Sequence, residues 1–222
     1  MAPKRNSLAL SPTQERKLVD FLEDKFLDIT RNFKKRSDPS SKLQTLSAYL
    51  TETHTLLSLI LQIPPVDPST PLRTSFLLRL TGEVMDGITG YRPDVQTLPQ
   101  LLDWLNDLDR GWLCVLRAQK WDPEAREGVD LVVESPKDEE LPLRSTPMNQ
   151  TERTRLKSLL IAGTAKLEEW LVELDAGEES YDVALERLGL QQGFDDLFSN
   201  TLAEMGALRG AVNIPQGMEG TC

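Results

Sequence analysis

Apolar residues recur every three or four positions along most of this chain, which is the spacing of an amphipathic α-helix. Each apolar stripe covers one face only, so each expected helix must bury that face against neighbouring helices. The pattern predicts an all-α fold, a helical bundle of about six or seven helices. The stripes are Leu18, Leu22, Phe26, Ile29 and Phe33; Leu43, Leu46, Leu50, Leu57, Ile60 and Leu61; Leu72, Phe76, Leu77, Leu80 and Val84; Leu101, Leu105, Leu108, Trp112 and Val115; and Leu156, Leu160, Gly163, Leu167, Trp170 and Leu174.

Capping signals and prolines predict where these helices begin and end. In four places an oxygen-bearing side chain stands three residues before a Gln or Glu, so that two side chains can satisfy two free backbone N–H groups. The capping residues are Ser11, Ser41, Thr97 and Asn149. Pro64-Pro65 is expected to end the second helix, and Thr70-Pro71 to begin the third.

Residues 120–148 interrupt the helical pattern. They contain four prolines and a cluster of acidic residues, which predicts a flexible acidic insertion with a short extended piece at residues 129–133. The expected organisation is a disordered tail (1–10), a helical bundle (11–119), the insertion (120–148), C-terminal helices that pack on the same core (149–210) and a second tail (211–222).

Charge and composition narrow the class of protein. The 222 residues carry a formal net charge of -10, and an acidic chain disfavours a general nucleic-acid coat, which is normally basic. The charge is uneven, because residues 1–42 hold ten Lys/Arg against six Asp/Glu. The most apolar run, residues 56–63, is shorter than the roughly 20 residues that cross a bilayer, so we expect no membrane contact. Two distant cysteines favour a reduced, intracellular protein.

Few side chains are available for chemistry. One histidine, His54, and two cysteines, Cys114 and Cys222, cannot build the usual zinc sites, and no glycine-rich phosphate loop occurs. Asp103, Asp107 and Asp109 lack the alternation of a calcium loop and are expected on a solvated helix face. We therefore predict no metal, no cofactor and no catalytic residue. An enzyme assembled from several helices stays open, and a deep pocket at His54 or Cys114 would favour it.

Two groups of residues are candidate contact sites: the cations Arg31, Lys34, Lys35, Arg36 and Lys42 near the end of the first helix, and the tryptophans Trp104, Trp112 and Trp121. Tryptophans often anchor interfaces, although they also fill cores. The cations could contact phosphates, act as a nuclear-import signal or simply stabilise a helix end.

Because catalytic residue types are scarce and candidate contact residues are present, we predict a non-catalytic intracellular interaction protein. We expect an adaptor or subunit of a multi-protein assembly, in the nucleus rather than the cytoplasm. Its expected partners are other proteins, of a kind that the sequence does not identify. The alternative is a chromosome- or nucleic-acid-associated factor that uses residues 31–42. The sequence leaves a homo-oligomer open.

Four Ser/Thr-Pro pairs are a further signal. Ser11 and Thr70 stand where a helix is expected to begin, so capping accounts for them. Ser135 and Thr146 lie in the expected insertion and are candidates for proline-directed phosphorylation.

Overall fold

The computed structural model describes residues 9–131, 145–174 and 180–212. Within these ranges the chain is predominantly helical and carries one small antiparallel hairpin, which confirms the predicted all-α bundle. The elements are α1 (Pro12–Lys34), α2 (Leu46–Leu61), α3 (Thr70–Ile88), α4 (Leu98–Leu116), β1 (Lys120–Asp122), β2 (Glu127–Val129), α5 (Gln150–Val172), α6 (Tyr181–Leu188), α7 (Gln191–Asp195) and α8 (Ser199–Val212).

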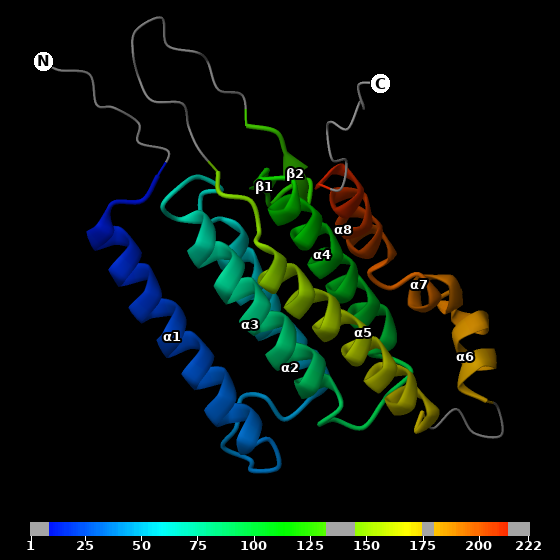
Figure 1. Cartoon of the computed structure of the whole chain (residues 1–222). Helices are drawn as coiled ribbons and strands as arrows, with labels where there is room; N and C mark the ends of the chain where they lie inside the picture. The colour runs from blue at the N-terminus through cyan, green and yellow to red at the C-terminus, as the bar shows by residue number, and fades with distance from the viewer. Residues whose placement is uncertain (1–8, 132–144, 175–179, 213–222) are drawn as a thin grey trace, which may run out of the picture.

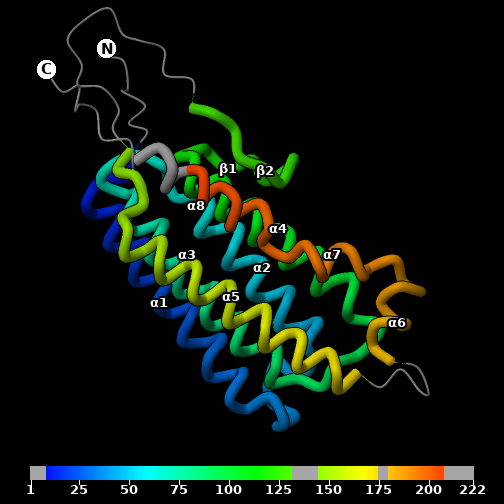
Figure 2. Tube along the Cα trace, turned by 45° about the vertical axis from the view of Figure 1, so that its right-hand side comes forward, coloured from blue at the N-terminus to red at the C-terminus, as the bar shows by residue number. Residues whose placement is uncertain are grey.

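The five long helices lie side by side, with α1 at one edge of the bundle (Figure 1). Helix α3 packs against α2 and α5, while α4 packs against α2 and α8. The short helices α6 to α8 follow the α4 side of the bundle in both views (Figures 1 and 2). The hairpin contacts α4, so it closes the end of the bundle at which α4 finishes.

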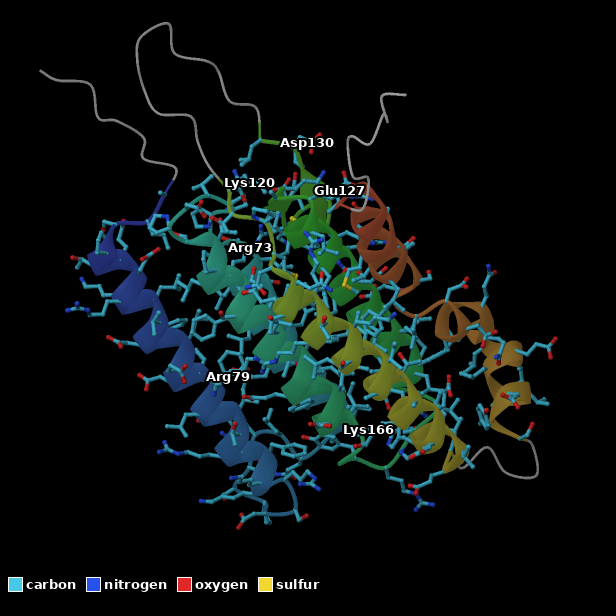
Figure 3. All side chains as sticks on the ribbon, viewed as in Figure 1. Arg73, Arg79, Lys120, Glu127, Asp130 and Lys166 are labelled. Atoms are coloured by element: carbon cyan, nitrogen blue, oxygen red, sulfur yellow. The ribbon has the colours of Figure 1, made fainter. Side chains whose placement is uncertain are left out.

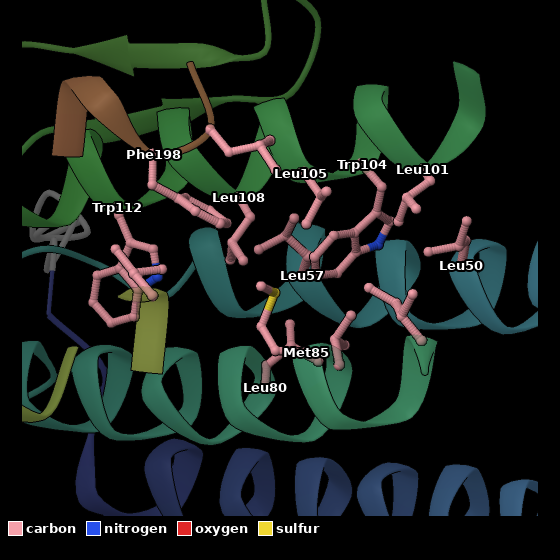
Figure 4. Packing of buried hydrophobic residues seen from close by; sticks show 14 of the residues in the cluster. Leu50, Leu57, Leu80, Met85, Leu101, Trp104, Leu105, Leu108, Trp112 and Phe198 are labelled. Atoms are coloured by element: carbon pink, nitrogen blue, oxygen red, sulfur yellow. The ribbon is translucent and has the colours of Figure 1, made fainter. Parts of the chain in front are cut away.

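The predicted apolar stripes form one continuous core. Leucines and tryptophans of α4 interdigitate with α2 and α3, and Phe198 reaches them from the turn before α8 (Figure 4). Gly163 of α5 lies on the buried stripe, and a Cβ there would stand 2.5 Å from Met85 Cε of α3. The missing side chain therefore allows α3 and α5 to approach each other closely.

Two of the predicted capping boxes are present. Ser11 accepts from the backbone of Gln14 at 3.3 Å while the Gln14 side chain returns to the Ser11 backbone at 2.8 Å. Asn149 and Glu152 make the same reciprocal pair at 2.9 and 2.8 Å. The sequence predicts both capping boxes correctly because the two partners of each box lie within one helical turn.

The other two predicted capping boxes do not form. Helix α2 begins four residues later than the Ser41 signal implies and is capped by Thr45, because the Ser41 hydroxyl donates instead to the carbonyl of Asn32 at 2.8 Å. Thr97 precedes α4, as expected, but its hydroxyl bonds the Asp94 carbonyl at 3.0 Å and makes no cap. In both cases the hydroxyl donates to a backbone carbonyl outside the expected capping box.

The first part of the expected insertion is a hairpin. Strands β1 and β2 pair antiparallel, and Asp122 Oδ1 accepts the N–H groups of Glu124 and Ala125 at 2.8 and 3.2 Å, which fixes the turn. The predicted extended piece at 129–133 overlaps β2 only at Val129. Residues 132–144, like most of both expected tails, lie outside the described residues.

None of the helices in the described ranges has the length and apolar character needed to cross a bilayer.

Candidate functional site

The structure brings the predicted cations together at the C-terminal end of α1. After Lys34 the chain turns back, and the Lys42 backbone N–H donates to Asn32 Oδ1 at 3.2 Å. The Ser41 hydroxyl bonds the same residue, so residues 41 and 42 are held beside the last turn of α1. Cations separated by several residues in sequence therefore share one end of the bundle.

Arg36 has a structural role within this group. Its guanidinium lies 4.4 Å from the centre of the Phe33 ring, and its Nε donates to the carbonyl of Gly90 at 2.8 Å. A further bond joins Nη1 to the Phe33 carbonyl at 3.2 Å. Arg36 thus ties the end of α1 to the turn after α3, and it is less available to a partner than the sequence suggested.

The remaining four cations, Arg31, Lys34, Lys35 and Lys42, are exposed, and we call them the basic end. None forms an ion pair with a carboxylate among the residues that the structure describes. The nearby Asp38 has a lowered pKa, chiefly because it accepts hydrogen bonds from Ser40, with a smaller contribution from the charge of Lys35. Leu27 precedes Arg31 by one turn and is 43% exposed, which adds an apolar contact beside the cations.

The three tryptophans are buried in the core, although Trp104 and Trp121 also border hollows described below, so they are not the exposed contact residues that the sequence suggested. Trp104, Trp112 and Trp121 are all buried, and the indole N–H of Trp112 bonds Thr81 Oγ1 at 3.0 Å. Trp112 and Trp104 lie on the inner side of α4, where indole rings fill the space between helices (Figure 4).

A second polar centre surrounds Asp107 of α4, which is only 2% exposed. His54 Nε2 of α2 lies 2.7 Å from Asp107 Oδ2, and Arg126 of the hairpin donates to the same oxygen through Nε at 2.8 Å and also through Nη2. Arg126 also reaches Asp103 at 2.9 Å. Burial acts to raise the pKa of Asp107, but the hydrogen bonds and charges of His54 and Arg126 outweigh it and lower the pKa.

Asp109 is the other buried acid of α4. Its carboxylate accepts the Thr201 N–H at 3.1 Å, the Thr201 hydroxyl at 2.5 Å and the Asn200 amide at 3.0 Å. It therefore caps α8 from a neighbouring helix. The expectation of a solvated acidic face is wrong for Asp107 and Asp109, because each carboxylate holds a second element against α4. No cluster of three potential metal ligands occurs in the described part of the chain.

His54 and Cys114 differ in access. The His54 side chain is 40% exposed and borders a hollow of about 260 Å³ between α2 and α4. Within the described ranges, no hydroxyl or thiol is hydrogen-bonded to its ring, so the His54–Asp107 pair has no positioned protein nucleophile. The hollow is lined by Leu50, Thr51, His54, Thr55, Gln100, Asp103 and Trp104.

Cys114 is sealed inside the bundle. Its Sγ accepts from Arg73 Nη2 at 3.1 Å, and the thiol donates to the Gln119 carbonyl at 3.2 Å. Burial raises the pKa of Cys114 and lowers the pKa of Arg73. Arg73 lies at the same end of the bundle as the hairpin residue Lys120 (Figure 3). A buried, protonated thiol is a poor nucleophile, which disfavours catalysis by Cys114.

An apolar groove of about 480 Å³ separates the α2–α3 turn from the hairpin. It is lined by Leu61, Gln62, Ile63, Pro64, Pro65, Val66, Lys120, Trp121, Pro123 and Leu131. Of the two candidate phosphorylation sites, Thr146 lies near this groove through its contact with Asp67, the residue after Val66. Ser135 lies outside the described residues.

No protein-family model, no curated protein and no solved structure matches this chain.

Proposed function

We propose that this chain is a non-catalytic interaction protein, an adaptor or subunit of an intracellular assembly, and that it binds an acidic partner protein through the basic end. The observation that carries this proposal is the group of four exposed cations without ion pairs to described carboxylates, on a chain of net charge -10. Exposed cations that form no ion pair with a described carboxylate can attract an acidic surface and increase its rate of association.

The support beneath these cations favours recognition. The Ser41 and Lys42 contacts with Asn32 and the Arg36 contact with Gly90 fix the backbone at the end of α1. Binding of a partner would therefore cost the conformational entropy of the side chains but not that of the loop, which is already ordered. The exposed Leu27 gives this surface the mixture of apolar and charged contacts that is typical of non-obligate interfaces.

An acidic protein fits this surface better than a nucleic acid. Four cations displace about four counterions, which supports only weak, salt-sensitive binding to a duplex at physiological salt. The acidic remainder of the chain also repels a duplex more strongly than an acidic protein surface, because a duplex carries one negative charge per about 1.7 Å of its axis. Nucleic-acid binding is the second candidate, because it would use the same four cations.

Co-purification of charge variants tests the proposal. The test variant is Arg31→Glu/Lys34→Glu/Lys35→Glu, and the matched control is Arg16→Glu/Lys17→Glu/Lys157→Glu, which reverses three other exposed cations. We expect the wild type and the control to recover the same acidic partner in stoichiometric amount, and the test variant to lose it. Recovery of the wild type alone under gentle lysis, or equal recovery by the test variant, would contradict the proposal.

The nucleic-acid alternative has its own measurement. Binding of the purified chain to duplex DNA and to single-stranded RNA would be titrated at about 50 and 200 mM salt, where counterion release gives a steep dependence. Tight binding at the higher salt that the test variant abolishes would favour the alternative over a protein partner.

A further inference from the structure

The three Ser/Thr-Pro pairs in the described residues differ in how exposed their hydroxyl-bearing residue is and in whether it caps a helix. Ser11 caps α1 within a capping box, and Thr70 is buried at the start of α3. Thr146 is exposed and lies in the non-helical stretch 145–149 that leads into α5. Of these three described sites, Thr146 is the one that is exposed and does not cap a helix.

Thr146 is held by one carboxylate. Its hydroxyl donates to Asp67 Oδ2 at 2.7 Å, and its backbone N–H donates to Asp67 Oδ1 at 3.1 Å. Asp67 belongs to the α2–α3 turn and follows Val66, which lines the apolar groove. The two bonds therefore fasten the approach to α5 against the rim of that groove.

We propose that Thr146 is the acceptor of a proline-directed protein kinase and that phosphorylation releases residues 145–147 from Asp67. In this reaction Thr146 Oγ1 forms a bond to the γ-phosphorus of ATP and the bond to the β-phosphate oxygen breaks. ADP leaves, and the hydroxyl proton passes to the base of the kinase.

The chemistry of the product accounts for the release. Phosphothreonine carries a charge of about -1.5 to -2 at neutral pH and has lost the hydroxyl donor. The bond to Asp67 Oδ2 cannot form, and the phosphate faces a carboxylate of the same sign. Next to an acidic residue, an added phosphate disrupts a contact by like-charge repulsion.

The change should stay local. Met148 is buried in the core, and the capping box of Asn149 and Glu152 fixes the start of α5. These contacts do not involve Thr146, so the bundle keeps its fold while the two residues before Met148 move away from the α2–α3 turn. The basic end, where α1 finishes, lies at the opposite end of the bundle from the start of α5 (Figure 1).

The test uses the full chain, a purified proline-directed serine/threonine kinase and ATP. Mass spectrometry locates the phosphate, and hydrogen exchange follows peptides that cover residues 62–70 and 145–152. We expect phosphate on Thr146 and exchange of the Thr146 amide at least about tenfold faster, because bonds to a charged acceptor are lost. A synthetic peptide of residues 141–151 shows that the kinase is active on this sequence.

Two variants separate charge from the loss of a hydroxyl. In Asp67→Asn the like charge is absent, so phosphorylation should accelerate exchange no more than Thr146→Val does, because only the hydroxyl bond is lost. Thr146→Val removes the hydroxyl bond without adding charge and should accelerate exchange less than the phosphate does. The proposal is overturned if Thr146 of the folded chain stays unmodified while the peptide is modified. It is equally overturned if phosphate on Thr146 leaves exchange unchanged, or if Asp67→Asn shows the full acceleration.

Discussion

The buried carboxylate of Asp107 offers the sharpest test of how the hairpin and α2 are held to α4. In Asp107→Asn the side chain keeps its shape but loses its charge. His54 and Arg126 then lose the anion that joins them, while Arg126 keeps its contact with the exposed Asp103. The substitution therefore removes charge-assisted bonds and creates little cavity.

The expected cost follows from the exposure of each partner. A buried hydrogen bond to a charged group contributes about 1.5–3 kcal/mol. The side chains of Arg126 and His54 are 35% and 40% exposed, so water screens both interactions and each is worth less than this range. We expect Asp107→Asn to lower the free energy of unfolding by about 2 kcal/mol.

The pH dependence has a definite sign. The pKa of Asp107 is lowered in the folded chain, so the unfolded chain binds more protons as the pH falls. The stability that this carboxylate contributes is present above its unfolded pKa of about 3.9 and is lost as the pH falls through the lower, folded pKa. The difference between the wild type and Asp107→Asn should therefore shrink as the solution is acidified from about pH 5 to pH 3.

Urea unfolding followed by tryptophan fluorescence measures both effects. With a slope of about 2 kcal/mol per M, a loss of 2 kcal/mol lowers the midpoint by about 1 M. Asp103→Asn is the matched control, because Asp103 pairs with the same arginine but is 63% exposed, and it should cost no more than about 0.5 kcal/mol. Equal effects of the two variants, or an Asp107→Asn effect that is constant from pH 5 to pH 3, would refute this reasoning.

Three further predictions concern the packing and the backbone. Gly163→Ala should leave the chain about 1–3 kcal/mol less stable than Gly206→Ala in thermal unfolding, because Met85 crowds a Cβ at 163 whereas nothing lies within 4 Å of one at 206; equal stabilities would contradict the close α3–α5 contact. Ala118 has φ 53 where α4 ends, so Ala118→Gly should stabilise the chain by about 0.5–1 kcal/mol in the same assay, and a loss would show that this strain is absent. In a Cys222→Ser variant, Cys114 should resist a maleimide until urea unfolds the protein; rapid native labelling would show that it is not sealed.

The sequence predicted the helices and their buried faces because an apolar stripe is a local pattern. The capping boxes at Ser11 and Asn149 were likewise predictable, since their partners lie within one turn. The signal at Ser41 misled because its hydroxyl bonds Asn32, nine residues earlier, and nothing local indicates that competition. A capping residue can therefore be predicted from sequence only when no residue outside its own helix competes for its side chain.

The candidate sites divide in the same way. The sequence predicts that Arg31, Lys34 and Lys35 lie together, because all three stand at the end of one helix. The bond between Arg36 and Gly90 joins residues 54 positions apart, so no local pattern predicts it. Asp107 was misjudged for the same reason, since its partners lie 53 and 19 positions away. The tryptophans were ambiguous from sequence, because an indole suits both an interface and a core. An indole at a stripe position of a helix favours the core, and Trp112 occupies such a position in α4.

Cross-linking of the isolated complex is the most direct test of the basic end as a docking surface. A reagent that couples lysine amines to nearby carboxylates would be applied to the purified assembly, and the cross-linked peptides identified by mass spectrometry. The proposal predicts that Lys34, Lys35 and Lys42 couple to Asp or Glu residues of the partner, whereas Lys157 does not. Cross-links that avoid the three basic-end lysines and gather at Lys157 would contradict it.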